Sequence, residues 1–328
     1  MKYIRLSEVI SATPSWLWYP YIPAGKISLI VADPGVGKTF FSLYLAAKIS
    51  SGQPFFGEDE GGTPAVVVYQ TAEDGIADTI KPRLEQMKPN FDNIIILDES
   101  KGAIALSDIK KIEEIMIDLH PRMMVFDPLQ AYLSAEIDIN RANEIRPVLA
   151  NVAQIAEKYN CAILFCMHNN KSTQKSAVYK ALGSVDIPAV ARSMLWIGRD
   201  PLDNNSRLLC HEKASLSEKG CSLRFIINPE NGGVEFLGYS NLSYEDIQNF
   251  PIKRTSIKCD EVQNKIMLLF RNKDELEIKN ITSLCSKLGC SKDTLYKAAN
   301  SLGIQKQIVG FGSEKRTVWK SPKHCADN

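Results

Sequence analysis

The sequence predicts an α/β fold: a mostly parallel sheet covered by helices on both faces, followed by a small second domain. Two observations predict the sheet: the chain contains short, wholly apolar runs of strand length, and these runs alternate with longer segments of helical periodicity. A third observation, a change of pattern toward the C-terminus, predicts the second domain. A chain of 328 residues is long enough for both.

The alternation begins at residue 26. The expected parallel strands are Lys26–Ala32, Ala65–Thr71, Ile94–Leu97, Met123–Asp127 and Cys161–His168. The helices expected between them are Lys38–Ser50, Ile76–Met87, Leu106–Leu119 and Arg141–Tyr159. From Arg192 onward, turn-rich sequence predicts a meander that extends the sheet on one edge. Its strands are Ser193–Ile197, Arg207–His211, Leu223–Ile227 and Val234–Leu237.

These segments predict four regions. They are an N-terminal arm (1–25), the α/β domain (26–242), a polar linker (243–258) and a small C-terminal domain (259–322). Residues 1–250 carry 24 basic and 30 acidic side chains, a net charge of −6, whereas residues 251–328 carry 15 and 8, a net charge of +7. The C-terminal region is therefore the better candidate for contact with a polyanion, although a basic solvated surface would have the same charge.

Composition excludes several classes of protein. The chain is 45% hydrophobic and 23% charged, and its apolar runs are far shorter than the ~20 residues of a membrane span. Neither a signal peptide nor a membrane partner is expected, which indicates the cytoplasm. The eight cysteines include no Cys-x-x-Cys pair, so we expect reduced core residues such as Cys161 and Cys166 and no zinc site.

A glycine-rich run, Ala32-Asp33-Pro34-Gly35-Val36-Gly37-Lys38-Thr39, joins the first expected strand to the first expected helix. That context is the one that a P-loop requires, because backbone N–H groups and a helix N-terminus then face an anion. Lys38 is expected to reach the β- and γ-phosphates of ATP, and the Thr39 hydroxyl to bind Mg²⁺. The predicted nucleotide-binding residues are Asp33, Pro34, Gly35, Val36, Gly37, Lys38, Thr39 and Phe40. Ala32 replaces the usual first glycine, which is tolerable if Ala32 keeps a strand-like φ.

Two acidic positions complete the expected chemistry. Asp127 ends an apolar strand and is predicted to hold Mg²⁺ through water, the alternative being a cap on the turn before Pro128. Glu73 follows another strand, at the sheet edge where ligands of parallel sheets bind, and is the predicted base that activates water. The neighbouring Asp74 is a rival that could equally cap the next helix.

Several motifs together resemble the RepA-like branch of hexameric, RecA-fold ATPases, which are common on mobile genetic elements. In chain order the motifs are Trp16-Leu17-Trp18, Ile22–Lys26, the P-loop, Ala72-Glu73-Asp74, Asp78–Leu84, Phe126–Leu129, His168–Lys171 and Ala191-Arg192-Ser193. The resemblance extends from Trp16 to Pro229, and its ordered set of motifs is more specific than the P-loop alone. It implies a RecA-like core with nucleotide bound between subunits.

The resemblance also implies roles that the residues alone do not establish. Arg192 matches an arginine finger supplied to a neighbouring subunit, Lys213 a second such cation, and His168 a sensor of the γ-phosphate. The loop 169–183 would grip single-stranded DNA in a central channel through three lysines, Lys171, Lys175 and Lys180. Without the resemblance, these side chains are ordinary strand-end or loop residues. Trp16 and Trp18 are expected simply to pack the arm on the core.

The C-terminal order of three helices and two strands resembles a winged helix. Its recognition helix would be Lys292–Leu302, with Ser291 as N-cap, and its wing Gln305–Trp319. The side chains expected on DNA phosphates are Lys292, Thr294, Lys297, Lys306, Lys315 and Arg316. Protein–protein contact is the rival use of such a domain.

The combined expectation is a DNA-dependent ATPase using ATP and Mg²⁺, a ring-forming replicative helicase of a plasmid, phage or other mobile element. Single-stranded and duplex DNA, a homo-hexamer, and a primase or polymerase are the expected partners. Three alternatives remain open: a recombinase-like filament former, an ATP-switched regulator that binds a specific duplex, and a replication assembly factor.

Overall fold

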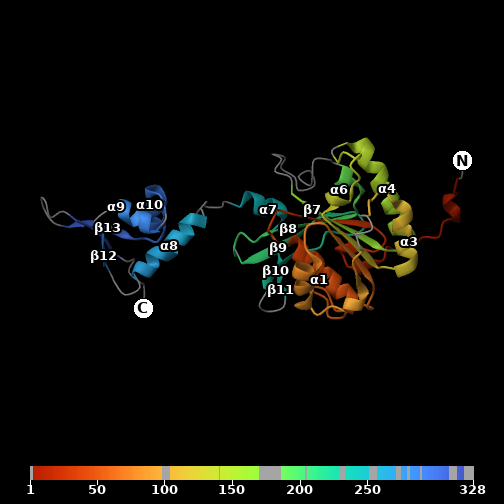
Figure 1. The fold of residues 1–328 in the computed structure, drawn as a ribbon, viewed down its shortest axis with the longest axis horizontal. Helices are drawn as coiled ribbons and strands as arrows, with labels where there is room; N and C mark the ends of the chain where they lie inside the picture. Colours follow the sequence, from red (N-terminus) through yellow and green to blue (C-terminus); the bar gives the residue numbers. More distant parts are fainter. Residues whose placement is uncertain are drawn as a thin grey trace. The chain divides into compact units, whose positions relative to one another are not determined.

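A computed structural model describes residues 3–97, 104–139, 141–169, 186–203, 205–228, 233–250, 257–270, 275–278, 281–288, 290–309 and 316–320. The chain forms two compact units, Met1–Phe250 and Pro251–Asn328. Each unit is described by itself below (Figure 1). None of the helices in the described part of the chain has the length and apolar character that a membrane span needs.

The first unit is built on a sheet whose described strands number nine, in the order β11-β10-β9-β8-β3-β7-β6-β4-β5. The strands are β3 (Ile27–Ala32), β4 (Val67–Thr71), β5 (Ile94–Ile95), β6 (Met123–Asp127), β7 (Ala162–His168), β8 (Ser193–Arg199), β9 (Ser206–Ala214), β10 (Ser222–Asn228) and β11 (Gly233–Ser240). Strands β8 to β5 pair in parallel, and β9 to β11 extend the sheet in antiparallel fashion. The predicted α/β class and edge meander are confirmed.

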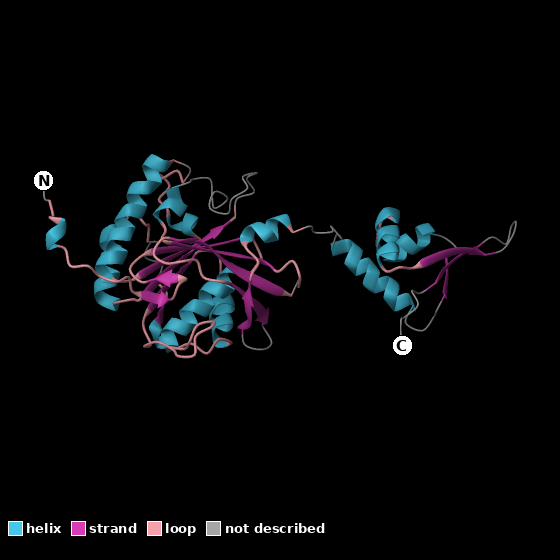
Figure 2. Cartoon of the chain, turned by 180° about the vertical axis from the view of Figure 1, so that it is seen from behind, coloured by secondary structure: helices cyan, strands magenta, loops and turns pink. Residues whose placement is uncertain are grey.

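Helices cover both faces of this sheet (Figure 2). They are α1 (Lys38–Ser51), α2 (Lys81–Glu85), α3 (Ile109–Leu119), α4 (Ala142–Tyr159), α6 (Asp186–Val190) and α7 (Tyr244–Asn249). Short helical turns are η1 (Leu6–Glu8), η2 (Ile76–Ile80), η3 (Phe91–Asn93) and η5 (Leu129–Tyr132). Alternate residues of β3 enter separate cores: Ile30 packs with the α1 side, and Leu29 with the α3 and α4 side. Both faces of the sheet are therefore buried, which explains why the parallel strands are apolar throughout.

Two predicted regions differ from the structure. Residues 16–25 are not an arm: β1 (Trp16–Trp18) and β2 (Ile22–Pro23) form a hairpin whose Trp18 is buried in the core beside Phe41 and Phe55. The segment 243–258 is not wholly a linker, because α7 occupies part of it. Ser243 and Asp246 form a capping box there, and the buried Tyr244 ring packs 4.5 Å from that of Trp196. The buried aromatic anchors Trp18 and Tyr244 explain both differences.

A buried histidine ties the N-terminal hairpin to the sheet. The Gly220 N–H donates to His211 Nδ1 over 2.9 Å, so Nε2 carries the proton and faces the Ser193 hydroxyl at 3.1 Å. Ser193 in turn donates to the Tyr21 carbonyl over 2.5 Å. Burial, and then the Lys219 charge, lower the pKa of His211 to about 4. The imidazole is therefore neutral in the folded protein.

This pKa predicts acid sensitivity. The unfolded chain binds the His211 proton near the ordinary value of 6.5, whereas the folded protein binds it only near 4, so stability is complete above pH 6.5 and falls as the pH drops toward 4. We expect His211 to remove about 2 kcal/mol from the free energy of unfolding between pH 7 and pH 5. Urea unfolding at both pH values measures this. His211→Gln should be less stable at pH 7 and lose less on acidification; an equal loss in both proteins would refute the assignment.

The second unit has a small core of its own. Its elements are α8 (Ile257–Phe270), β12 (Glu275–Ile278), α9 (Ile281–Leu288), α10 (Lys292–Ser301), β13 (Gln305–Val309) and β14 (Arg316–Lys320). The described strands pair in the order β12-β14-β13, and Trp319 is buried with Val262, Ile266 and Leu295. Ser291 caps α10 by accepting from the Thr294 N–H, as predicted. Strand β12 was not predicted.

Candidate nucleotide site

The P-loop lies at the carboxyl end of β3. Ala32 is the last residue of that strand, fully buried between His168 of β7 and Ile197 of β8, so the expectation that alanine keeps a strand conformation there is confirmed. Gly35 and Gly37 have φ values of +74° and +112°, which side chains other than glycine rarely adopt. A Cβ on Gly37 would also collide with the Ile227 side chain, whereas the space at Gly35 is open. An anion can therefore approach the loop backbone at Gly35.

The adjacent residues Lys38 and Thr39 both contact Asp127, which lies almost ninety residues later in the sequence. Lys38 Nζ forms an ion pair with Asp127 Oδ1, and Thr39 Oγ1 donates to Asp127 Oδ2 over 2.9 Å. Both charged side chains are buried. Burial alone lowers the pKa of Lys38, but the charge of Asp127 and the hydrogen bond to it outweigh burial and raise that pKa. The lysine therefore stays charged, as phosphate binding requires.

A pocket of about 510 Å³ opens above these residues at the carboxyl edge of the sheet. Its lining residues are Asp33, Pro34, Gly35, Gly37, Lys38, Thr39, Phe40, Glu73, Asp74, Arg83 and His168. The predicted base and sensor face each other there, with Glu73 Oε1 3.7 Å from His168 Nε2. The Glu73 side chain is 55% exposed, so its carboxylate can reach water. Predicted residues from three strand ends thus line one site, and Val36 packs just outside the pocket, buried in the core.

The structure adds Arg83, on α2, which was not singled out from the sequence. Its Nη1 lies 3.0 Å from Asp74 Oδ2, and its guanidinium lies 4.7 Å above the Phe40 ring. Asp74 therefore pairs with Arg83, while Gly75 caps the following turn without a side-chain bond, so the capping alternative for Asp74 is wrong. The flat guanidinium and ring together offer a surface on which a nucleobase could stack.

Arg207, on β9, forms a hydrogen bond with the backbone of the P-loop. Its Nε donates to the Val36 carbonyl over 3.0 Å, and its Nη1 donates to the Asn205 carbonyl over 2.6 Å. The antiparallel extension of the sheet thus holds the loop backbone, together with Ile227 against Gly37. No local pattern marks Arg207, because the contact spans 171 residues of sequence.

Residues 4–174, just over half of the chain, match the family described as AAA domain. The chain belongs to the AAA domain family. The match covers the P-loop, Glu73, Asp127 and His168 of this AAA domain protein. It therefore includes every residue on which the ATPase chemistry is expected to depend, apart from the basic residues Arg192 and Lys213.

This AAA domain protein is also similar to curated proteins named DNA repair protein RadA. It is 24% identical to that of Halalkalibacterium halodurans over 152 residues, which are 46% of this chain and 29% of the relative. It is 26% identical to that of Streptococcus pneumoniae over 149 residues, 45% of this chain and 31% of the relative. The chain thus spans about three tenths of these relatives. Among solved structures, the RadB recombinase matches 66% of this chain and 91% of its own, with a TM-score of 0.49 and 16% identity.

Arg192 and Lys213 lie at the other edge of the sheet. The Arg192 N–H donates to the Ile27 carbonyl, at the start of β3, so about 16 Å of strand separates it from the P-loop side. Its side chain is exposed. Lys213 Nζ donates to the Pro188 carbonyl over 2.7 Å and to that of Ala189 over 3.2 Å. Within one chain, neither residue can serve the nucleotide pocket.

The predicted DNA contacts have mixed outcomes. Lys171, Lys175, Lys180 and Lys315 lie outside the described residues, as does the side chain of Arg316, which begins β14. Lys292 and Lys297 are exposed on α10. Thr294 shares a 2.9 Å hydrogen bond with Ser291. Lys306 donates to Asn300 over 3.1 Å and lies 4.2 Å above the Tyr296 ring, so it is partly engaged within its own unit.

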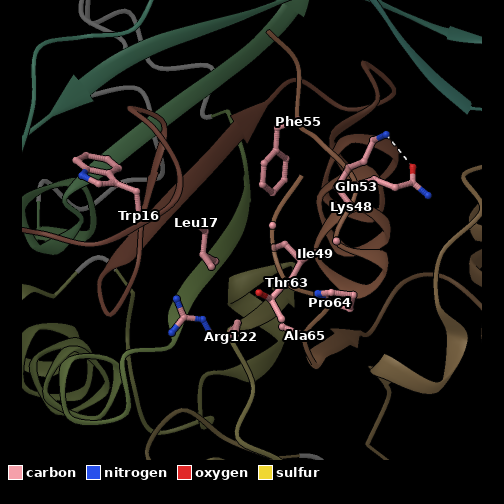
Figure 3. A pocket seen from close by; sticks show the side chains of 12 residues that line it. Trp16, Leu17, Lys48, Ile49, Gln53, Phe55, Thr63, Pro64, Ala65 and Arg122 are labelled. Atoms are coloured by element: carbon pink, nitrogen blue, oxygen red, sulfur yellow. Dashed lines mark hydrogen bonds between the residues drawn. The ribbon is translucent and has the colours of Figure 1, made fainter. Parts of the chain in front are cut away.

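A second cavity, of about 440 Å³, lies at the amino ends of β4 and β6 (Figure 3). Trp16, Phe55 and Arg122 line it, and Lys48 there donates to Gln53 over 3.0 Å. It contains none of the predicted catalytic or nucleotide-binding residues. The expectation of simple packing holds for Trp18, in the core, whereas Trp16 borders this cavity and packs edge-on against Tyr19.

Proposed function

We propose that this protein is a DNA-dependent ATPase whose nucleotide binds at the P-loop pocket. The observation that carries the proposal is the convergence of Lys38, Thr39, Asp127 and Glu73 from three parts of the chain at one edge of the sheet. Open space at Gly35 and a buried, charged lysine fit a polyphosphate. A hydroxyl beside a carboxylate fits Mg²⁺, which would neutralise phosphate charge when bound.

The chain's own residues then have distinct tasks. The loop backbone and Lys38 bind the phosphates, and Thr39 and Asp127 would hold Mg²⁺. Arg83 and Phe40 support the nucleobase. Glu73 accepts the proton of the attacking water, and His168, 3.7 Å away, senses the change of charge beside it. Because β7 continues from His168 into loop 169–183, that change is passed toward the proposed DNA contacts.

Two features favour DNA as the partner. The relatives that match the nucleotide-binding half are named as DNA repair proteins. Residues 251–328 carry a net charge of +7, with Lys292 and Lys297 exposed on α10. We therefore propose that the second unit is a winged helix binding DNA phosphates, and that loop 169–183 binds single strands.

We further propose that the protein works as a ring, as a replicative helicase of a mobile element. Arg192, exposed and remote from the P-loop of its own chain, suits a role in the pocket of a neighbour, and Lys213 lies at the same edge. A recombinase-like filament is the second candidate, because the matching relatives are DNA repair proteins. Electron microscopy with DNA and ATP separates closed rings from filaments.

ATP hydrolysis with and without single-stranded DNA tests the proposed function. We expect DNA to stimulate the wild-type rate severalfold or more, and Lys38→Ala to lower it at least about a hundredfold, because Lys38 stabilises the transferring phosphoryl. Lys158→Ala, which breaks an exposed ion pair with Glu113, is the matched control and should leave the rate unchanged. An ATP hydrolysis rate that single-stranded DNA does not change would refute a DNA-dependent motor and favour a regulator or assembly factor.

A further inference from the structure

Tyr69, on β4, lies within hydrogen-bonding distance of Asp127 and of Ser42 on α1, and it has no role in the chemistry described so far. Its side chain is fully buried, and its hydroxyl lies 3.3 Å from Asp127 Oδ2 and 2.8 Å from Ser42 Oγ. Ser42, also fully buried, follows the P-loop on α1, and its Oγ lies 2.9 Å from the Thr39 carbonyl. One hydroxyl network therefore connects the metal-side carboxylate to the first turn of α1.

The hydrogens of this network can be arranged in two ways that keep the hydrogen bond between Tyr69 and Ser42. Each hydroxyl has one hydrogen, and a carboxylate or a carbonyl can only accept. In the first arrangement, Tyr69 donates to Asp127 and Ser42 donates to Tyr69, so Ser42 no longer donates to the Thr39 carbonyl. If Ser42 donates to that carbonyl, Tyr69 donates to Ser42, and Asp127 Oδ2 keeps Thr39 as its donor. The network can thus exchange the donor at Asp127 from Thr39 to Tyr69 without moving a heavy atom far.

Nucleotide binding would require this exchange. Lys38 and Thr39 both contact Asp127, yet the proposed function places them on the phosphates and on Mg²⁺. Once they turn away, Asp127 would face the metal side with two donors fewer, and this residue is only 2% exposed. A buried carboxylate that lacks hydrogen bonds is unfavourable and poorly oriented. Tyr69 can remain, because its side chain is fully buried in the core on the α1 face of the sheet.

We propose that Tyr69 is a positioning residue that takes over hydrogen bonding to Asp127 when Mg²⁺ and nucleotide bind, and so fixes the carboxylate on the metal side. The inference rests on the proposed function of the pocket. It predicts that loss of the Tyr69 hydroxyl weakens Mg²⁺-dependent nucleotide binding and leaves nucleotide binding without Mg²⁺ unchanged. It also predicts that the loss of Ser42, the competing partner, does not weaken the metal site.

The test uses the full chain and a fluorescent ADP analogue as the probe. For Tyr69→Phe we expect unchanged binding of the probe in EDTA, and about a tenfold rise in the Mg²⁺ concentration that gives half-maximal Mg²⁺-dependent binding. Tyr44→Phe is the matched control, since Tyr44 is equally buried on α1 beside Phe56 and away from Asp127. Its Mg²⁺ midpoint should equal that of the wild type.

Ser42→Ala provides a second measurement should Tyr69→Phe fold poorly. Its Mg²⁺ midpoint should stay within about twofold of the wild type, because Tyr69 then has Asp127 as its partner. A wild-type midpoint in Tyr69→Phe, or a tenfold rise in Ser42→Ala, would overturn the inference while leaving the ATPase proposal intact. Wild-type protein that fails to bind the probe with Mg²⁺ would overturn the proposed function and this inference with it.

Discussion

Glu73→Gln is expected to lower the turnover of Mg·ATP by about 10²–10⁴-fold while the affinity for nucleotide stays near that of the wild type. Glu73 lies at the mouth of the pocket, 55% exposed, with a carboxylate that water can reach. Glutamine has nearly the same shape but cannot accept a proton from attacking water. Single-turnover hydrolysis and equilibrium binding of a fluorescent nucleotide separate the two effects.

Asp74→Asn is the control that distinguishes the neighbouring carboxylates. Asp74 forms an ion pair with Arg83, whose guanidinium lies above Phe40, so this change should loosen the side wall of the pocket. We expect weaker nucleotide binding and a turnover reduced much less than in Glu73→Gln. The opposite result, with near-normal turnover in Glu73→Gln and its loss in Asp74→Asn, would assign the base to Asp74.

The parts of the site that the sequence predicts are those encoded locally. The P-loop motif lies between a wholly apolar strand and a helical segment, which is enough to locate Lys38 and Thr39. Asp127 and Glu73 could be added because parallel strands share one carboxyl edge, so residues that end such strands converge, whereas His168 was added through the family resemblance. Their convergence needed no knowledge of side-chain contacts, and the structure places all three at that edge.

The parts that the sequence does not predict depend on contacts between distant segments. Arg207 supports Val36, and Tyr69 reaches Asp127, across 171 and 58 residues of sequence. No periodicity or spacing identifies such pairs. Strand β12 was missed for a related reason: its alternating sequence is only four residues long, and its pairing with β14 crosses the whole second unit.

Arg192→Ala is expected to lower the turnover of Mg·ATP by about 10³-fold, with nucleotide affinity little changed, if Arg192 acts as an arginine finger in a neighbouring pocket. The physical reason is the position of Arg192 relative to the P-loop of its own chain. Arg192 is exposed at the amino end of β8, and its own P-loop lies across the sheet. A cation there can act on phosphate only in a second copy of the chain. Arg146→Ala, which removes an exposed arginine from α4, should leave turnover unchanged.

Mixing two inactive variants tests whether this action is between subunits. Lys38→Ala lacks a working P-loop but keeps Arg192, and Arg192→Ala has the opposite defect. In a head-to-tail assembly, some interfaces of the mixture combine the intact P-loop of one variant with the intact Arg192 of the other. We therefore expect ATP turnover in the mixture well above that of either variant alone. Mixed assemblies that form but stay inactive, or an Arg192→Ala protein as active as the wild type, would show that Arg192 has no such role.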